Sequence, residues 1–271
     1  MGFETDKDVL AWYESQPRAL TKKFLNSIPW REVLNHELNP AFIPILVYMR
    51  DVESFTELYY DELLRTPTGK DPVIRKFMDR WSEEENEHAE VLNRFLNEAG
   101  FYTSEQWQQE AKDAIPRRYV FENRVAPIIT NCFGRHFSGA HMTWGAINEL
   151  TTLQGYRRLW QMAEHPVLEK ILRAVAQEES IHSQFYWHIA RLRLQESPFS
   201  QSIARFIIDK FWTPVGQGTK PRNETNYLIA TLFKGVKGVD FFDKMVNRRV
   251  EQLPGFNDLK NVTGRIAEIA L

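Results

Sequence analysis

The sequence is poor in cysteine, and its single copy, Cys132, cannot form a disulfide within the chain. One thiol also excludes zinc and iron–sulfur sites that are built from several thiolates. Both absences favour a reducing cytoplasm. The N-terminal residues lack the basic and apolar regions of a signal peptide, so we expect no targeting segment.

Long apolar runs and an excess of one charge are missing too. The longest apolar-looking stretches, 38–49 and 136–148, fall short of the roughly 20 residues that a membrane-spanning helix needs. A formal net charge of -2 provides no basic excess for a phosphate backbone. We therefore expect a soluble cytoplasmic protein with no membrane span and no nucleic-acid partner.

Long stretches also lack glycine and proline, and apolar residues recur in them every three or four positions, which indicates helices rather than strands. The pattern predicts an all-α protein with one domain over residues 1–271. Its core, about 40–195, should be four long helices in two hairpins, followed by a helical C-terminal extension over about 197–271. The long helices are expected over Pro40–Arg65, Pro72–Ala99, Arg124 or Pro127 to Ala163, and Val167–Gln195, and the shorter ones over Gln201–Trp212, Asn223–Phe233, Val239–Gln252 and Asp258–Ile269.

A Glu-x-x-His motif occurs twice, as Glu85 with His88 and as Glu179 with His182. Residues three apart share one face of a helix, so each motif can offer a carboxylate and an imidazole to the same ion. Each motif lies on the second helix of a predicted hairpin. Helical bundles that hold two metal ions complete such a set with one glutamate from each of two further helices.

The two remaining carboxylates should come from the first helices of the hairpins. On the first of these helices Glu53 is the favoured candidate, although periodicity alone leaves Glu57 nearly as good. On the other helix, Glu149 is the only acidic residue between Glu122 and Glu164. A lone carboxylate in such an uncharged stretch needs a partner, because burying it unpaired is costly.

Each motif contains a rival acid, Glu84 or Glu178, which lies four residues before the histidine. The three-residue spacing of known bundle sites selects Glu85 and Glu179 instead. The alternative to a metal site is a solvated charged helix face, which is common for a single motif. Four carboxylates with two imidazoles suit two irons better than tetrahedral zinc.

The segment from Trp81 to His88, WSEEENEH, resembles the W-[ST]-x-E-E-N-x-H signature of the soluble acyl-acyl carrier protein desaturases. The second motif resembles their D-E-x-R-H segment, but Glu178 replaces the aspartate and Ile181 replaces the arginine. The resemblance covers the predicted core, about 40–195, and is weaker at both ends. The length of the chain is similar to that of the compact bacterial branch of the family.

This resemblance implies a ferritin-like homodimer that inserts a cis double bond into an acyl chain carried on acyl carrier protein. It also implies a di-iron centre of two iron ions and two electrons from ferredoxin. The family's pattern of a tyrosine six residues after the first ligand favours Glu53, followed by Tyr59, over Glu57. Thr152, three residues after Glu149, matches a threonine near the oxygen-binding face and is our candidate catalytic residue.

Other functions fit the same ligands. They are a ferritin-like oxidase or hydroxylase acting on an acyl or natural-product substrate, an iron protein of the ferritin type, and a ribonucleotide reductase small subunit. Among the remaining histidines, His141 lies two turns before Glu149, but like the others it is expected to be a surface or core group. The residues that we expect to line a substrate channel are Phe55, Trp81, Phe133, Met142, Trp144, Ile147, Trp160 and Phe185.

Overall fold

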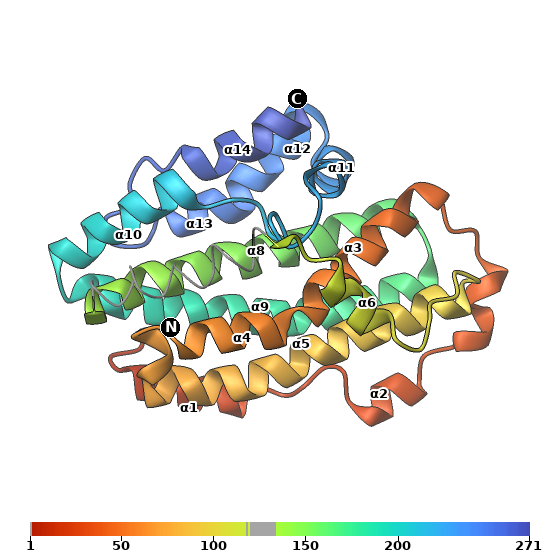
Figure 1. The fold of residues 1–271 in the computed structure, drawn as a ribbon, viewed down its shortest axis with the longest axis horizontal. Coiled ribbons are helices and arrows are strands. Elements are labelled where there is room, and N and C mark those ends of the chain that lie inside the picture. Colours follow the sequence, from red (N-terminus) through yellow and green to blue (C-terminus); the bar gives the residue numbers. More distant parts are fainter. Residues whose placement is uncertain (1, 118, 120–133) are drawn as a thin grey trace.

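The computed structural model describes residues 2–117, 119 and 134–271. These residues form helices and no β-strand, apart from one isolated bridge between Gln217 and Lys220. The predicted all-α fold is therefore confirmed, and it is a ferritin-like helical bundle (Figure 1). No helix among the described residues is long and apolar enough to cross a membrane. Cys132 and Phe133, which the sequence analysis singled out, lie outside the described residues.

The first hairpin consists of α3 (Ile43–Ser54) and α4 (Thr56–Leu64), which together run antiparallel to α5 (Pro72–Glu98). Asp71 caps α5 through its carboxylate, which accepts the backbone N–H groups of the first turn, and Pro72 occupies the first helical position. The start of this helix was thus predicted correctly from the Asp-Pro pair.

The prediction of one continuous helix over Pro40–Arg65 is wrong, because the helix is interrupted at Phe55. On either side of the break a hydroxyl bonds to the backbone. Ser54 donates to the carbonyl of Asp51 at 2.7 Å, and Thr56 donates to the carbonyl of Glu53 at 2.6 Å. Such bonds offer the backbone an alternative to the helical ladder, and the break lies two residues after Glu53.

The second hairpin consists of α8 (Phe137–Ala163) and α9 (Pro166–Gln195), which pack along most of their length. A short 3₁₀ turn, η4 (Gly134–His136), precedes α8. The predicted start of this helix near Arg124 or Pro127 lies outside the described residues.

The interior between the two hairpins is filled by aromatic side chains. Phe77 of α5 stacks on Phe185 of α9, with ring centroids 3.8 Å apart and planes 4° apart. Both rings are fully buried. Stacking of this kind fixes the distance between the two helices that carry the Glu-x-x-His motifs.

The N-terminal helix α1 packs against α5 and α9 and is seen beside α5 in Figure 1. Thr5 and Asp8 form a capping box at the start of α1. Short helices connect the longer ones. They are α1 (Asp6–Ser15), α2 (Lys22–Asn26), η1 (Trp30–Asn35), η2 (Pro40–Phe42), η3 (Thr68–Lys70) and α6 (Trp107–Asp113).

The C-terminal helices pack on the side of α8 that faces away from α5, as Figure 1 shows in blue. The predicted single helix over Val239–Gln252 is wrong, because a π-helical turn, η5, interrupts it. These elements are α10 (Pro198–Phe211), α11 (Arg222–Leu232), α12 (Gly235–Phe242), η5 (Asp243–Asn247), α13 (Arg248–Val250) and α14 (Asn261–Ala270). They add a second layer to the bundle along α8.

Candidate metal centre

Four helices each send acidic or imidazole side chains to one point in the middle of the bundle. α3 supplies Glu53 and α8 supplies Glu149, while α5 and α9 each supply one Glu-x-x-His pair. All six side chains are buried. The structure therefore brings together the whole predicted ligand set, which is Glu53, Glu85, His88, Glu149, Glu179 and His182.

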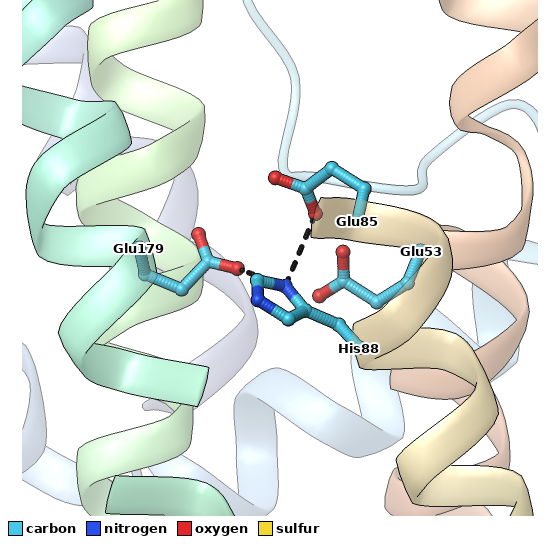
Figure 2. Close-up of side chains that lie close together, drawn as sticks. All are labelled: Glu53, Glu85, His88 and Glu179. Atoms are coloured by element: carbon cyan, nitrogen blue, oxygen red, sulfur yellow. Dashed lines mark ion pairs between the residues drawn. The ribbon is translucent and has the colours of Figure 1, made fainter. Parts of the chain in front are cut away.

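The six residues divide into two groups of four, and in each group the potential ligand atoms lie within 4.8 Å of one another. Glu53 and His88 belong to one group, and Glu149 and His182 to the other. Glu85 and Glu179 belong to both. Figure 2 shows the first group, with the carboxylates of Glu85 and Glu179 on either side of the His88 ring. Two ions in these positions would share two bridging carboxylates.

Several polar atoms at this point are buried and have no hydrogen-bond partner among the described residues. They include Nδ1 of His88 and Nδ1 of His182, one oxygen of Glu85 and both oxygens of Glu179. Buried polar groups without partners are rare in folded proteins and require an explanation. Metal ions at the centre would satisfy these atoms, so the donor set fits a two-metal site.

Burial and the crowding of charges shift the pKa values of several residues at the centre in opposite directions. Burial and the negative charge of Glu85 raise the pKa of Glu53 well above its usual range, and burial and the charge of Glu179 do the same for Glu149. Burial would also raise the pKa of Glu85. The close approach of the Glu53 carboxyl and of the His182 imidazole overcomes this effect and holds the pKa of Glu85 well below its usual range.

The two histidines respond to the same crowding of carboxylates. Burial would lower the pKa of each imidazole, but the hydrogen bond to Glu178 and the close carboxylate of Glu179 raise that of His88 well above its usual value. The hydrogen bond to Glu84 and the close carboxylate of Glu85 raise the pKa of His182 to about 9. Metal ions would replace these protons, because a ligating imidazole must be neutral and a ligating carboxylate ionised.

Each rival acid contacts the histidine of the other motif, on the side of the ring that faces away from the centre. Glu84 of α5 lies 2.8 Å from Nε2 of His182 on α9. Glu178 of α9 lies 2.9 Å from Nε2 of His88 on α5. This contact places a proton on Nε2 and turns Nδ1 toward the centre, which fixes the ring for metal binding. Neither rival acid belongs to the two ligand groups.

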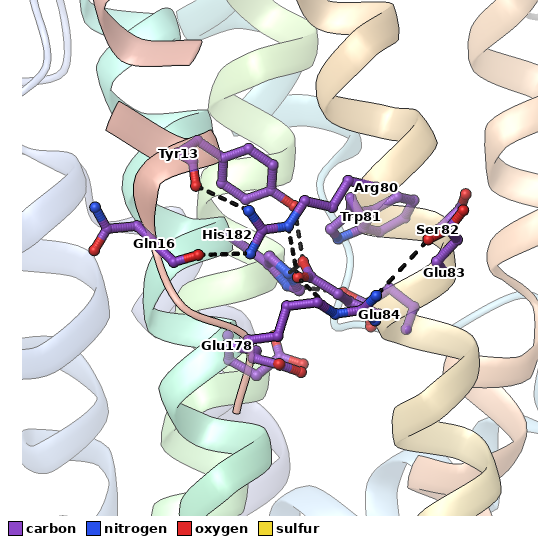
Figure 3. A network of polar contacts seen from close by, with 12 residues as sticks. Tyr13, Gln16, Arg80, Trp81, Ser82, Glu83, Glu84, Glu178 and His182 are labelled. Atoms are coloured by element: carbon purple, nitrogen blue, oxygen red, sulfur yellow. Dashed lines mark hydrogen bonds and ion pairs between the residues drawn. The ribbon is translucent and has the colours of Figure 1, made fainter. Parts of the chain in front are cut away.

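The carboxylate of Glu84 is itself anchored by the N-terminal segment. It accepts hydrogen bonds from the Tyr13 hydroxyl and from Nε of Arg80, both at 2.8 Å. The guanidinium of Arg80 in turn donates to the carbonyl of Gln16 at 3.1 Å (Figure 3). These contacts were not anticipated from the sequence, since Tyr13 lies 71 positions from Glu84 and no motif connects them.

The outer carboxylates of the centre also have fixed partners. Tyr156 donates a short hydrogen bond to Glu53, and the indole Nε1 of Trp81 donates to Glu149 at 3.2 Å. Glu57, which periodicity left as an alternative to Glu53, is instead exposed and paired with Lys112 at 2.6 Å. The helix break at Phe55 is what directs the two glutamates to different surroundings.

Residues 45–190, more than half of the 271-residue chain, match the rubrerythrin family. The chain belongs to this family. No curated protein matches the chain in a sequence search. The match supports the ferritin-like di-iron carboxylate superfamily, and the buried carboxylate–histidine cluster of this rubrerythrin-family chain could hold such metal ions.

A cavity of about 1430 Å³ opens beside the centre of this rubrerythrin-family chain. Four of the six clustered residues, the glutamates, line it, while the two histidines do not. Along α8 the lining runs from Phe137 to Gly155, which spans about 27 Å at the rise of an α-helix. Most of the other lining residues come from α3, α4, α10, α11 and the loop 213–219.

The loop 213–219 is held in the cavity wall by tyrosine hydroxyls. Tyr48 donates to the carbonyl of Val215 at 2.7 Å, and the Tyr59 and Thr219 hydroxyls lie 3.3 Å apart. Gly216 has a φ of +80°, and a Cβ there would come 2.3 Å from the Tyr48 hydroxyl oxygen. Only glycine allows this close approach without displacing the loop.

Of the residues that we expected to line a channel, Trp81 and Trp144 do line the cavity. Phe55 and Phe185 instead fill the core. Thr152, the candidate catalytic residue, lines the cavity one turn from Glu149. The remaining expected lining residues, Met142, Ile147 and Trp160, are outside the cavity wall.

Proposed function

We propose that this protein is a di-iron, oxygen-dependent desaturase that inserts a cis double bond into a fatty acyl chain. The observation that carries the proposal is the long, mostly apolar cavity along α8, whose wall includes the glutamates of the centre. An iron-storage protein has no need of such a space. Its volume exceeds the roughly 300–1,000 Å³ of pockets for drug-sized ligands, as a long chain requires.

The proposed ligands are those of the two groups described above. Glu53 and His88 would hold one iron and Glu149 and His182 the other, while Glu85 and Glu179, which belong to both groups, could serve either ion. When bound, the irons supply the activation of dioxygen. The acyl chain loses two hydrogens from adjacent carbons. With two further electrons and two protons from outside, dioxygen is reduced to two waters.

The protein residues position the substrate and the proton. An unactivated methylene offers no charge to bind, so the cavity walls alone decide which carbons reach the centre. We propose that the Thr152 hydroxyl, one turn from Glu149 on the cavity wall, passes protons to the face of the centre that opens into the cavity. Its expected loss on substitution by valine is about 10²-fold or more in turnover.

Partners follow from the chemistry and from the resemblance of the Trp81–His88 segment. We propose acyl carrier protein with its bound acyl chain as the substrate, ferredoxin or a similar protein as the electron donor, and a homodimer as the assembly. We also propose that residues 1–271 act as one domain, because α10 and α11 of the C-terminal layer form part of the cavity wall.

The test is a single-turnover reaction with iron-loaded, chemically reduced protein. Acyl chains of graded length are supplied on acyl carrier protein, on coenzyme A or as free acids, oxygen is added, and the chains are analysed by mass spectrometry. Loss of two hydrogens supports the proposal, whereas gain of one oxygen supports the hydroxylase alternative. No change in any chain would overturn both.

A matched pair of variants shows whether the centre is responsible. Glu149→Gln should abolish the reaction, since it removes a ligand while keeping the shape of the side chain. Glu57→Gln, at the exposed position that the structure sets apart from the centre, should leave it unchanged.

A further inference from the structure

His141 is a polar residue in the cavity wall that the proposed chemistry does not use. It lies on the same stretch of α8 as Trp144 and Glu149, and all three line the cavity. Its Nδ1 atom is shielded from solvent and has no hydrogen-bond partner among the described residues. The ring of Phe137 is tilted against it, with centroids 5.6 Å apart.

The imidazole of His141 is uncharged at neutral pH, because burial lowers its pKa to about 4. A neutral imidazole has one N–H donor and one acceptor nitrogen. Leaving such groups without a partner in an apolar wall is unfavourable. Nδ1 is shielded even from a water-sized molecule, so a molecule bound in this part of the cavity can reach the ring only through its other nitrogen, Nε2, which is not shielded in this way.

We propose that His141 is a positioning residue that hydrogen-bonds an uncharged oxygen of the substrate, either a carbonyl or a hydroxyl. The proposal rests on the proposed function, because it takes this ligand to be the acyl chain that the metal centre oxidises. Eight residues separate His141 from Glu149, so the two positions are about 12 Å apart along the helix axis. The substrate is then an apolar chain with an oxygen at about that distance from its reacting carbons.

His188 provides a matched comparison within the same chain. Burial lowers its pKa to about 4 as well, and its Nδ1 is likewise buried without a partner. It packs against Phe3 with ring centroids 4.8 Å apart and does not line the cavity. A general effect of replacing a buried neutral histidine should therefore appear at both positions, but an effect on ligand choice only at His141.

The experiment measures ligand choice in the metal-free protein. Protein is equilibrated with vesicles that contain equal amounts of methyl palmitate and octadecane, separated from them by gel filtration, extracted, and analysed by gas chromatography. The ratio of bound ester to bound alkane should fall about three- to tenfold in His141→Phe relative to the wild type, as expected for one neutral hydrogen bond. His141→Gln should keep most of the preference, and His188→Phe should keep all of it.

An unchanged ratio in His141→Phe, an equal change in His188→Phe, or failure of the wild type to retain either ligand would each overturn the proposal. If His141→Phe does not fold, the infrared carbonyl band of methyl palmitate bound to the wild type decides. A band shifted to lower frequency than in alkane solvent supports the hydrogen bond, and an unshifted band refutes it.

This assay needs neither iron nor turnover, so its failure is distinguishable from failure of the proposed function. Retention of the His141-dependent preference without any oxidation would leave the binding site in place and reject the desaturase. Oxidation with no His141-dependent preference would do the reverse.

Discussion

Replacing Glu178 by glutamine should weaken metal binding at His88. Glu178 contacts only Nε2 of that ring, the nitrogen that faces away from the centre. One Glu178 oxygen accepts the backbone N–H groups of Ala19 at 2.5 Å and Leu20 at 3.2 Å. The other lies 2.9 Å from Nε2 of His88. A glutamate accepts at both ends, whereas a glutamine accepts at one end and donates at the other.

The amide of the variant has one favourable orientation. If its NH₂ group faced the two backbone donors, both would be buried without an acceptor, at about 1–3 kcal/mol each. The amide oxygen should therefore stay with the backbone, and the NH₂ group should face Nε2 of His88. That nitrogen must then accept, so the ring carries its proton on Nδ1, the atom that lies 3.1 Å from Glu179 and would bind the metal.

The expected loss is about 10- to 100-fold in metal affinity at this position, the usual effect of removing a group that orients a ligand. It corresponds to about 1.4–2.8 kcal/mol. Equilibrium dialysis against graded ferrous iron under nitrogen, followed by metal analysis, measures it. At concentrations that give two irons per chain in the wild type, Glu178→Gln should hold close to one.

Glu84→Gln is the control, because the two oxygens of Glu84 are shared among their donors differently from those of Glu178. A single Glu84 oxygen serves both Tyr13 and His182, while the other serves Arg80. A glutamine that keeps its oxygen toward the first two turns its NH₂ toward Arg80. Unlike the fixed backbone donors at Glu178, the Arg80 side chain is 21% exposed and keeps the carbonyl oxygens of Tyr13 and Gln16 as acceptors, so it can move its Nε–H toward water and His182 keeps its tautomer. Equal iron content in Glu178→Gln and the wild type, or equal losses in both variants, would show that the tautomer argument is wrong.

The remaining predictions concern pH, core packing and one loop. His182 must lose the proton that its raised pKa of about 9 retains in the metal-free protein, so metal affinity should increase from neutral pH up to about 9; affinities that do not change over this range would contradict it. Phe77→Ala should lower the free energy of unfolding by about 3–5 kcal/mol in urea titrations, whereas Tyr102→Ala, at a residue 87% exposed, should change it little; similar losses in both would refute the packing argument. Gly216→Ala should lower the free energy of unfolding more than Gly235→Ala. Both positions have positive φ and share roughly 1–2 kcal/mol of backbone strain, but of the two only Gly216 has atoms within 4 Å of an added Cβ. Equal losses in the same titrations would show that the close approach contributes nothing.

The sequence was sufficient for the helices that carry strong boundary signals. Asp71 before Pro72 and the periodic apolar face predicted the start of α5, and the lone Glu149 in an uncharged stretch predicted a partnered carboxylate on the helix that is α8. The break at Phe55 could not be predicted in the same way. It depends on hydroxyl-to-carbonyl bonds from Ser54 and Thr56 that compete with a helical pattern of ordinary strength.

Spacing also predicted which residues meet at the centre but not what holds them. The three-residue interval separated Glu85 from Glu84, yet it gave no role to Glu84. That role depends on Tyr13, which reaches Glu84 only because α1 packs against α5 and α9. His141 was expected to be a surface or core group, and its place on the cavity wall depends on how α10 and α11 pack over α8.

The crossed arrangement of Glu84 and Glu178 explains why two adjacent glutamates precede each histidine at the same spacing. In each motif one glutamate belongs to the ligand cluster, and the other holds the histidine of the opposite helix. Neither helix therefore has an oriented imidazole until the other is packed against it. Both metal positions must therefore form together as α5 and α9 pair. Loss of the Glu84 or Glu178 carboxylate acts on the histidine of the other helix, His182 or His88, rather than on the histidine of its own helix.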